Sequence, residues 1–188
     1  MSPKAVVFAL SSTVMLVLDQ ASKAWVRANL SVHDERPIIA NFLSIAHAKN
    51  PGAAFSALAD FKYRYIVFYA FTAIAVGVLI QGYRQLRDND RFQGTAMGLI
   101  LAGALGNFID RVMSGEVTDM VKVYAGAEPY KSWAIQYSPY HSNVYPIWNV
   151  ADAAIVVGVG MFALSYLFEK DKPEAGAKAP GESAPQVE

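Results

Sequence analysis

Four long apolar runs, separated by polar connections, organise this 188-residue sequence. The runs without a charged residue are Ala5–Leu18, Tyr65–Tyr83, Phe92–Ile109 and Ala153–Phe168. A helix that crosses a bilayer needs roughly 17–25 apolar residues, so the second and third runs qualify directly. The first and fourth runs reach that length when Asp19 and Asp152 are counted as residues at the membrane rim. The pattern predicts an all-α membrane protein with four transmembrane helices.

The second run distinguishes this prediction from a soluble four-helix bundle. A surface helix of a soluble bundle carries a wide polar stripe, whereas residues 66–80 are apolar all round. A chain of this length cannot enclose four such helices in its own core. The first run follows Lys4, as in a cleavable signal peptide, but no small-residue cleavage site follows it. The helical pattern continues through Asp19 and Lys23, so we expect this helix to be retained.

Basic residues in the flanks predict the orientation of the helices. The short connection 84–91 holds three arginines, and Lys4 and Lys170 flank the helical region at its two ends. The much longer connection 110–152 holds only three basic residues. Lysine and arginine accumulate on the cytoplasmic side of membrane proteins. Both termini and the connection 84–91 are therefore predicted to lie in the cytoplasm, with the two long connections outside.

The two outer connections and the tail differ in composition. Residues 36–50 are rich in β-branched and aromatic side chains and predict one or two short strands, a small β-element outside the membrane. The connection 110–152 contains Trp133 and several tyrosines, which favour the headgroup level and suggest a surface loop or helix. A partly ordered loop is the alternative. We expect one four-helix transmembrane domain over 1–170 and a disordered cytoplasmic tail over 171–188. The Pro-, Ala-, Gly- and Glu-rich composition of the tail cannot form a core.

Composition excludes several kinds of chemistry. The chain has no cysteine, so disulfides, thiolate nucleophiles and cysteine-based zinc sites are ruled out. Its formal net charge is zero, which gives no indication of nucleic-acid binding. The three histidines are scattered, and HExxH, GxSxG and Walker A patterns are absent. We therefore expect neither a metal nor an organic cofactor.

Two aspartates near the ends of the third and fourth runs suggest acid–base chemistry. Asp119 stands within the apolar string VTDMV, where a lone buried carboxylate is costly. Asp152 begins the fourth helix, with Asn149 three residues before it on the same face. Either residue could simply cap that helix, and for Asp152 capping and function are equally plausible. If Asp119 and Asp152 meet, they cannot both ionise easily, and the pair shares a proton. The ionised member then activates water while the protonated member polarises a carbonyl.

A second polar group ends the third run, in the string GALGNFIDRV. It contains Asn107, Asp110 and Arg111, after two glycines, Gly103 and Gly106, that allow close backbone approach. Helix packing together with an Asp110–Arg111 rim pair is the simpler explanation. It leaves Asn107, inside the apolar run, unexplained.

Two further sites carry weaker signals. Asp19 and Lys23 are spaced i, i+4 at the outer end of the first helix, where an exposed pair contributes only about 0.2–0.5 kcal/mol. Asn50 begins the string NPGAAFS, which in isolation is a turn. Each gains meaning only in combination with the others.

Taken together, five strings resemble the lipoprotein signal peptidase (signal peptidase II) family. In the family's order they are DQASK (19–23), NPGAAFS (50–56), GALGNFIDRV (103–112), VTDM (117–120) and WNVADAAI (148–155). The resemblance spans roughly residues 5–168. Family members are intramembrane aspartic endopeptidases of the bacterial inner membrane, without a cofactor. They remove the signal peptide of lipidated prolipoproteins just before a diacylglyceryl-modified cysteine.

The resemblance implies a role for each polar residue. Asp119 and Asp152 would be the catalytic pair. Supporting or substrate-binding roles would fall to Asp19, Lys23, Asn50, Asn107, Asp110, Arg111 and Asn149. The partners would be the lipidated prolipoprotein and membrane lipid.

The sequence departs from the family pattern in the connection between the two aspartates. This connection is longer than usual, with the extra residues around 126–143. Because they lie between Asp119 and Asp152 in the sequence, we expect them to arch over the site as a cover. Thr118, Met120 and Trp148 also stand where the family commonly has other apolar residues.

Two other function classes compete with a peptidase. An ion-coupled transporter also uses membrane carboxylates, but its sites usually lie near the midplane of repeated halves. Here the polar residues crowd one rim, and no repeat is visible. A structural membrane subunit would not need Asn107, Asp119 and Asp152 together.

Overall fold

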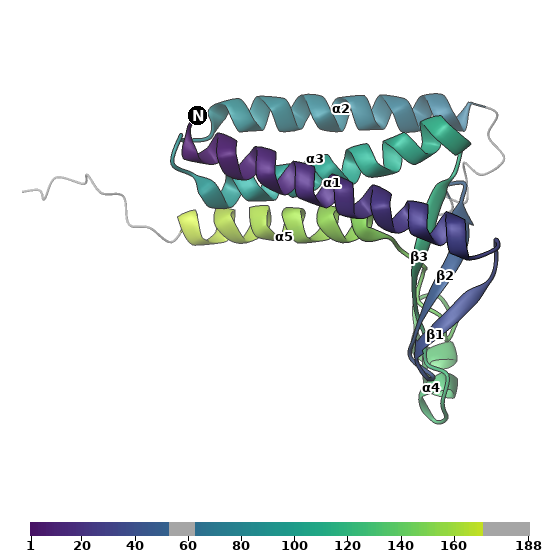
Figure 1. Ribbon diagram of the computed structural model, residues 1–188. Coiled ribbons are helices and arrows are strands. Elements are labelled where there is room, and N and C mark those ends of the chain that lie inside the picture. Colours follow the sequence, from purple (N-terminus) through teal and green to yellow (C-terminus); the bar gives the residue numbers. More distant parts are fainter. Residues whose placement is uncertain (53–62, 171–188) are drawn as a thin grey trace, which may run out of the picture.

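The computed structural model describes residues 1–52 and 63–170, and Figure 1 shows their arrangement. The four apolar runs form four long helices that lie lengthwise beside one another. These helices are α1 (Pro3–Asn29), α2 (Arg64–Gln85), α3 (Arg91–Ser114) and α5 (Val150–Lys170). The first helix runs unbroken through Asp19 and Lys23, as predicted. Residues 53–56 of the NPGAAFS string and the predicted tail lie outside the described residues.

The described helices match a membrane in length and composition. Three are long and apolar enough to cross a bilayer: Pro3–Asn29, Tyr65–Gln85 and Arg91–Ser114. The apolar part of α5, Val150–Ser165, is shorter. None of the most apolar stretch of α2 is buried within the protein. The sequence-based prediction that this helix is apolar all round is thus matched by an outward-facing apolar surface, which suits lipid rather than water.

The small β-element projects sideways from one end of the bundle (Figure 1). It is an antiparallel sheet in the order β1-β2-β3, with β1 at Glu35–Ile39, β2 at Leu43–Asn50 and β3 at Val117–Val123. The first two strands confirm the prediction for 36–50. The third strand was not predicted, although it carries Asp119.

Register places one end of the sheet at the bundle and the other far from it. Asn50 pairs with Val117 and Ala48 with Asp119, while Leu43 pairs with Val123 at the opposite end. Met120 packs with Val26 of α1 and with Leu30, which follows that helix, and this fixes the sheet to the bundle near Asp119. At about 3.4 Å per residue, Val123 lies roughly 14 Å further along the strand than Asp119.

The opposite end of the bundle gathers the N-terminus and the α2–α3 connection. The Lys4 ammonium lies 3.2 Å from the Asp88 carboxylate and donates to the Leu86 carbonyl at 2.5 Å. Figure 1 shows α5 ending at this same end. The N-terminus, the C-terminal end of α5 and the basic connection 84–91 therefore share one end of the described bundle.

The expectation that residues 126–143 cover the two aspartates is wrong. They form α4 (Tyr130–Tyr137) and its flanks, which lie at the tip of the sheet remote from the bundle (Figure 1). The Gly126 N–H donates to the Asn41 carbonyl in the β1–β2 turn. The chain then returns beside β3 through the bridges Tyr124↔Val144 and Val121↔Trp148. The inserted residues therefore lie beyond the far end of the sheet, and the chain that follows them runs antiparallel to β3, back toward the bundle.

Candidate active site

Asp119 and Asp152 meet around the side chain of Asn149. Asp119 lies on β3 and is 3% exposed, and Asp152 lies in the first turn of α5. The Asn149 Nδ2 group donates to Asp119 Oδ1 at 2.6 Å, and the Asn149 backbone N–H donates to Asp152 Oδ2 at 3.2 Å. One fully buried asparagine thus holds both carboxylates.

Asn149 also caps α5, so the capping explanation is correct but incomplete. Its Oδ1 accepts from the Asp152 backbone N–H at 3.0 Å, while Asp152 accepts from the Asn149 N–H. This reciprocal pair satisfies two N–H groups at the start of the helix. A cap needs only the Oδ1 atom, and the Nδ2 group reaches Asp119 instead. Asn149 and Asp152 therefore cap the start of α5, and Asn149 joins the two carboxylates.

Two further asparagines complete the hydrogen bonds of the pair. Asn50 Nδ2, from the end of β2, donates to Asp119 Oδ2 at 2.9 Å. Asn107 Nδ2, from α3, donates to Asp152 Oδ1 at 2.8 Å. All four carboxylate oxygens accept at least one hydrogen bond, which fixes the orientation of both groups. This answers the question of why Asn107 stands within an apolar run.

Lys23 is a buried cation that is linked to Asp152 through the side chain of Asn107. Its ammonium is 3.0 Å from Asp19, 3.2 Å from Asp110 and 3.0 Å from Asn107 Oδ1. Lys23 is 0% exposed and Asp19 is 1% exposed, so the interpretation as an exposed surface pair is wrong. A buried charge needs a partner and further hydrogen bonds, and this cluster supplies both.

The two carboxylates bound to Lys23 each hold the backbone next to a site aspartate. Asp19 Oδ1 accepts from the Ala151 N–H at 2.9 Å, one residue before Asp152. Asp110 Oδ2 accepts from the Thr118 N–H at 2.9 Å, one residue before Asp119. Lys23 therefore connects both attachments and, through Asn107, the Asp152 side chain. This network couples α1 and α3 to the ends of β3 and α5.

Glycines permit the close approach that these bonds require. A Cβ atom on Gly106 would collide with the Asp19 carboxylate, and one on Gly103 would collide with the Ala151 carbonyl. The prediction of close backbone approach is thus confirmed at Gly103, whereas the atoms close to Gly106 belong to the Asp19 and Ala151 side chains. Asp19 can reach α5 because Gly106 of α3 has no side chain at the place that the Asp19 carboxylate occupies.

Arg27 belongs to the cluster but was not predicted. Its Nη1 donates to Thr118 Oγ1 at 3.1 Å and lies 3.5 Å from Asp110 Oδ1. The spacing Asp19, Lys23, Arg27 is i, i+4, i+8, which puts all three on one face of α1. That regular spacing was the available signal. Asp110 is therefore paired with Lys23 and Arg27, and the alternative of an Asp110–Arg111 rim pair is wrong.

Arg111 faces another part of the rim. Its guanidinium carbon lies 4.6 Å from the centre of the Phe68 ring of α2, and Nη1 donates to the Asn107 carbonyl at 3.3 Å. Within the part of the chain that the structure describes, its buried Nε has no hydrogen-bond partner. Arg111 thus carries a donor beside the aspartate pair that a bound group could use.

Burial changes the acidity of Asp119. Removal from water raises the pKa of its carboxyl to about 6, and the neighbouring Asp152 carboxylate acts in the same direction. The amide donors of Asn50 and Asn149 lower the pKa but do not offset the burial. Asp119 is therefore the member of the pair that binds a proton more readily than a free aspartate does.

Comparison with known proteins agrees with this arrangement. The family model described as signal peptidase (SPase) II matches residues 11–168. The chain belongs to the signal peptidase II family. Members of this family, the lipoprotein signal peptidases, cleave signal peptides from prolipoproteins. The matched region includes every site residue described above.

Individual signal peptidase II relatives cover most of the chain. The lipoprotein signal peptidase of Geobacter sulfurreducens is 41% identical over 82% of this chain and 88% of its own length. That of Geobacillus thermodenitrificans is 35% identical over 92% of this chain and 96% of its own. A bacterial membrane enzyme solved in meso at 2.3 Å resolution has a TM-score of 0.72 and 27% identity, covering 91% of this chain and 94% of the other. The helical bundle with its projecting sheet is therefore the architecture of a solved membrane enzyme.

Proposed function

We propose that this signal peptidase is an aspartic endopeptidase in which Asp119 and Asp152 form the catalytic pair. The observation that carries the proposal is the shared hydrogen bonding of both carboxylates to the buried Asn149. The charge of Asp152 acts on Asp119 so as to raise its pKa, which favours one proton between the two carboxylates. No step requires a metal or an organic cofactor.

Burial and exposure assign different roles to the two aspartates. Asp119, with its raised pKa, holds the proton and donates it toward the scissile carbonyl oxygen. Asp152, which is less buried, takes a proton from the attacking water. Asn149 and Asn107 keep the two groups oriented, so little reorganisation is needed during the reaction. The Arg111 Nε, which has no hydrogen-bond partner among residues 1–52 and 63–170, is suited to a substrate carbonyl.

The membrane placement follows from the outward-facing apolar helices. All four long helices would cross the bacterial inner membrane, with α5 completing the span beyond Ser165. The end that gathers Lys4 and the connection 84–91 would face the cytoplasm. The aspartate pair would then lie at the outer surface, where β3 leaves the bundle. Residues 1–170 would act as one peptidase domain.

The substrate would be a prolipoprotein that carries a diacylglyceryl group on cysteine. Its apolar signal helix would lie in the bilayer beside the bundle, and its acyl chains would hold the cysteine at the surface. Membrane anchoring at both sides of the scissile bond places that bond at the height of Asp119 and Asp152, which reduces the entropy lost on reaction.

The experiment uses purified enzyme in lipid nanodiscs and two prolipoproteins, one lipidated and one with its lipidated cysteine replaced by serine. We expect cleavage of the lipidated form only, immediately before the modified cysteine. Mass spectrometry of both products locates the bond. Equal cleavage of the two forms would contradict lipid-dependent recognition.

The rate should depend on pH through Asp119. Because its pKa is raised to about 6, Asp119 is protonated below that value and loses its proton above it. We therefore expect kcat/KM to fall as pH rises through about 6. A substrate that removes more water from Asp119 would move this fall to higher pH. The pKa measured belongs to the pair rather than to one residue.

The variant Asn50→Ala tests whether the fall in kcat/KM at higher pH comes from Asp119. Asn50 donates to Asp119 and lowers its pKa, so its removal should move the falling limb to higher pH. Glu116→Gln is the matched control, because Glu116 pairs with Lys49 near the start of β3 and does not touch the aspartates. A limb that stays in place or moves to lower pH in Asn50→Ala would contradict the assignment.

A further inference from the structure

Helix α4 presents an aromatic face that the protein does not cover. Tyr130, Trp133 and Tyr137 stand at i, i+3 and i+7, on one side of the helix. They are 69%, 64% and 62% exposed, and no residue of α4 is buried. Tyr140 and Tyr145, both more than half exposed, form a T-shaped pair beside the helix. Trp133 and Tyr137 also contact each other, and the five exposed rings on and beside α4 are here called the aromatic platform.

Packing against the sheet does not account for α4. A cavity of about 700 Å³ lies between the helix and the sheet tip, lined by residues such as Phe42, Tyr124, Tyr130 and Ala134. An eight-residue helix is not stable in water by itself, so it needs a surface to pack on. A large exposed apolar patch with polar edges is typical of a contact surface.

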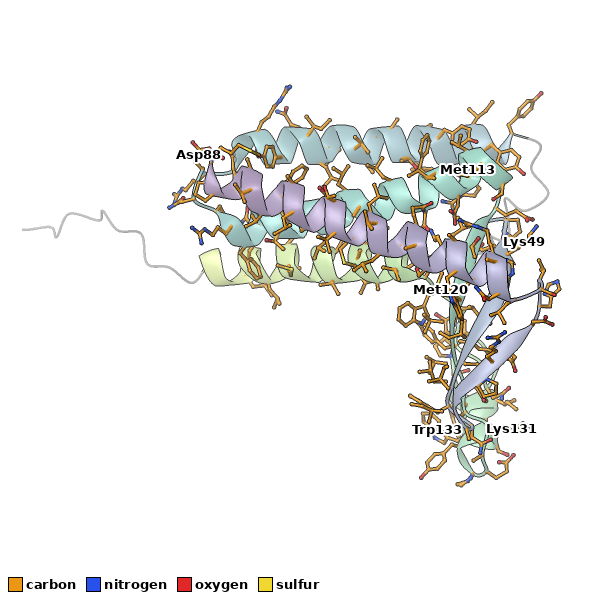
Figure 2. The ribbon with its side chains drawn as sticks, viewed as in Figure 1. Lys49, Asp88, Met113, Met120, Lys131 and Trp133 are labelled. Carbon is orange, nitrogen blue, oxygen red and sulfur yellow. The ribbon has the colours of Figure 1, made fainter. Side chains whose placement is uncertain are left out.

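The direction of the platform points to the occupant. In Figure 2, Asp88 and Met113 mark the two ends of the bundle, and the sheet projects sideways near Met113. Trp133 lies on the side of the sheet tip that faces back along the bundle, whereas Lys131 lies on the opposite side. If the bundle crosses a bilayer, the Trp133 side faces the lipid surface and the Lys131 side faces water.

We propose that the aromatic platform is an interfacial anchor that seats the tip of the sheet on the outer leaflet of the lipid bilayer. This inference rests on the membrane placement in the proposed function. Tyrosine and tryptophan concentrate at the headgroup level because one end of each ring system is apolar and the other polar. Trp133 lies on the side of the tip that faces back along the bundle, and Lys131 lies on the opposite side, which suits a helix seated on a lipid surface.

Anchoring the tip has a consequence for Asp119. The residue lies on β3, which runs without interruption from the bundle to Val123 and then to the insertion that contains α4. The sheet is held to α1 at Met120 near one end, and the platform holds its other end. Two supports fix the tilt of the strand that carries Asp119 relative to the membrane surface.

The absence of cysteine from the sequence allows a direct test. Trp133→Cys and Lys131→Cys are labelled separately with the fluorophore NBD in the full-length enzyme. The labelled proteins are placed in phosphatidylcholine–phosphatidylglycerol nanodiscs, with and without phosphatidylcholine that carries a nitroxide quencher near the top of one acyl chain. Tyr137→Cys is a second probe of the same face. Labels at Met113→Cys and Asp88→Cys mark the two ends of the bundle.

Since interfacial helices insert about 5–10 Å into the headgroup region, the label at position 133 should lose at least about twofold more fluorescence to the quencher than the label at 131. The label at 137 should behave like that at 133. Equal, weak quenching at 131, 133 and 137 would overturn the anchor. A water-shielded but unquenched label at 133 would indicate a protein partner and would also overturn it. If the markers at 113 and 88 escape the quencher too, the membrane placement in the proposed function fails with it, whereas quenched markers confine the failure to the platform.

Discussion

Asp119→Asn and Asp152→Asn should each abolish most cleavage of a lipidated prolipoprotein. Each substitution removes one of the two groups that move protons, and a general acid or base contributes roughly 10²–10⁴-fold to a rate. We expect the single-turnover rate constant of each single variant to fall by roughly 10²-fold or more. Loss in kcat rather than in KM would place the effect in the chemical step.

The control must separate chemistry from folding. Both oxygens of Asp119 accept amide donors, so an asparagine at 119 must turn its NH₂ group toward one of them. Thermal unfolding of each variant in the same detergent shows whether the protein is still folded. Glu116→Gln, which neutralises a carboxylate three residues away, should keep wild-type activity. A folded Asp119→Asn variant with a near wild-type rate would remove Asp119 from the catalytic pair.

Lys23→Met should cause a large loss of stability. It leaves the Asp19 and Asp110 carboxylates, 1% and 2% exposed, without the cation that lies between them. Removing one partner from a buried charge cluster costs about 3–5 kcal/mol. For a protein of this size, that corresponds to a fall in Tm of roughly 6–20 °C. Differential scanning fluorimetry in detergent measures the shift.

Two further variants test the cause of that loss. Lys122→Met removes a surface lysine paired with Glu35, and an exposed pair contributes at most about 1 kcal/mol. Its Tm should stay within a few degrees of wild type. Combining Lys23→Met with Asp19→Asn removes the carboxylate that has lost its cation, leaves Asp110 paired with Arg27, and should recover part of the lost Tm. Wild-type stability in Lys23→Met would mean that the cluster does not hold the fold.

The sequence predicted the bundle well because its signals were long. Each helix follows an apolar run of 14 residues or more, and a run such as Tyr65–Tyr83 has no competing interpretation. Polar residues at the ends of these runs were visible for the same reason. A group such as Asn107 is costly in an apolar helix unless a partner lies nearby, so its presence indicated one.

Short elements with distant partners were not predictable. The strand β3 has only seven residues, and its partner β2 lies about 70 residues earlier in the sequence. Arg27 is a single charge near the end of a helix, and only the neighbouring Asp110 and Thr118 give it a role. The i, i+4 spacing of Asp19 and Lys23 is compatible with an exposed or a buried pair. The sequence alone therefore could not show that both side chains are buried.

The misplaced insertion has a geometric explanation. We inferred that a segment between two neighbouring residues must arch over them. The chain instead leaves Asp119 along β3, turns at α4, and returns antiparallel through Val144 and Trp148 to Asn149. A strand and its return bring the two ends together equally well. The pairings of Val121 with Trp148 and of Tyr124 with Val144 distinguish this path from an arch.

The most direct test of the catalytic pair compares Asp119→Asn, Asp152→Asn and the double variant in single-turnover cleavage of a lipidated prolipoprotein. Groups that act as one unit are strongly non-additive, because losing either member already removes the shared mechanism. We therefore predict that the double variant is no slower, within a few-fold, than the slower single variant. A double variant slower by the product of the two single losses would contradict the account, since it would mean that Asp119 and Asp152 act independently.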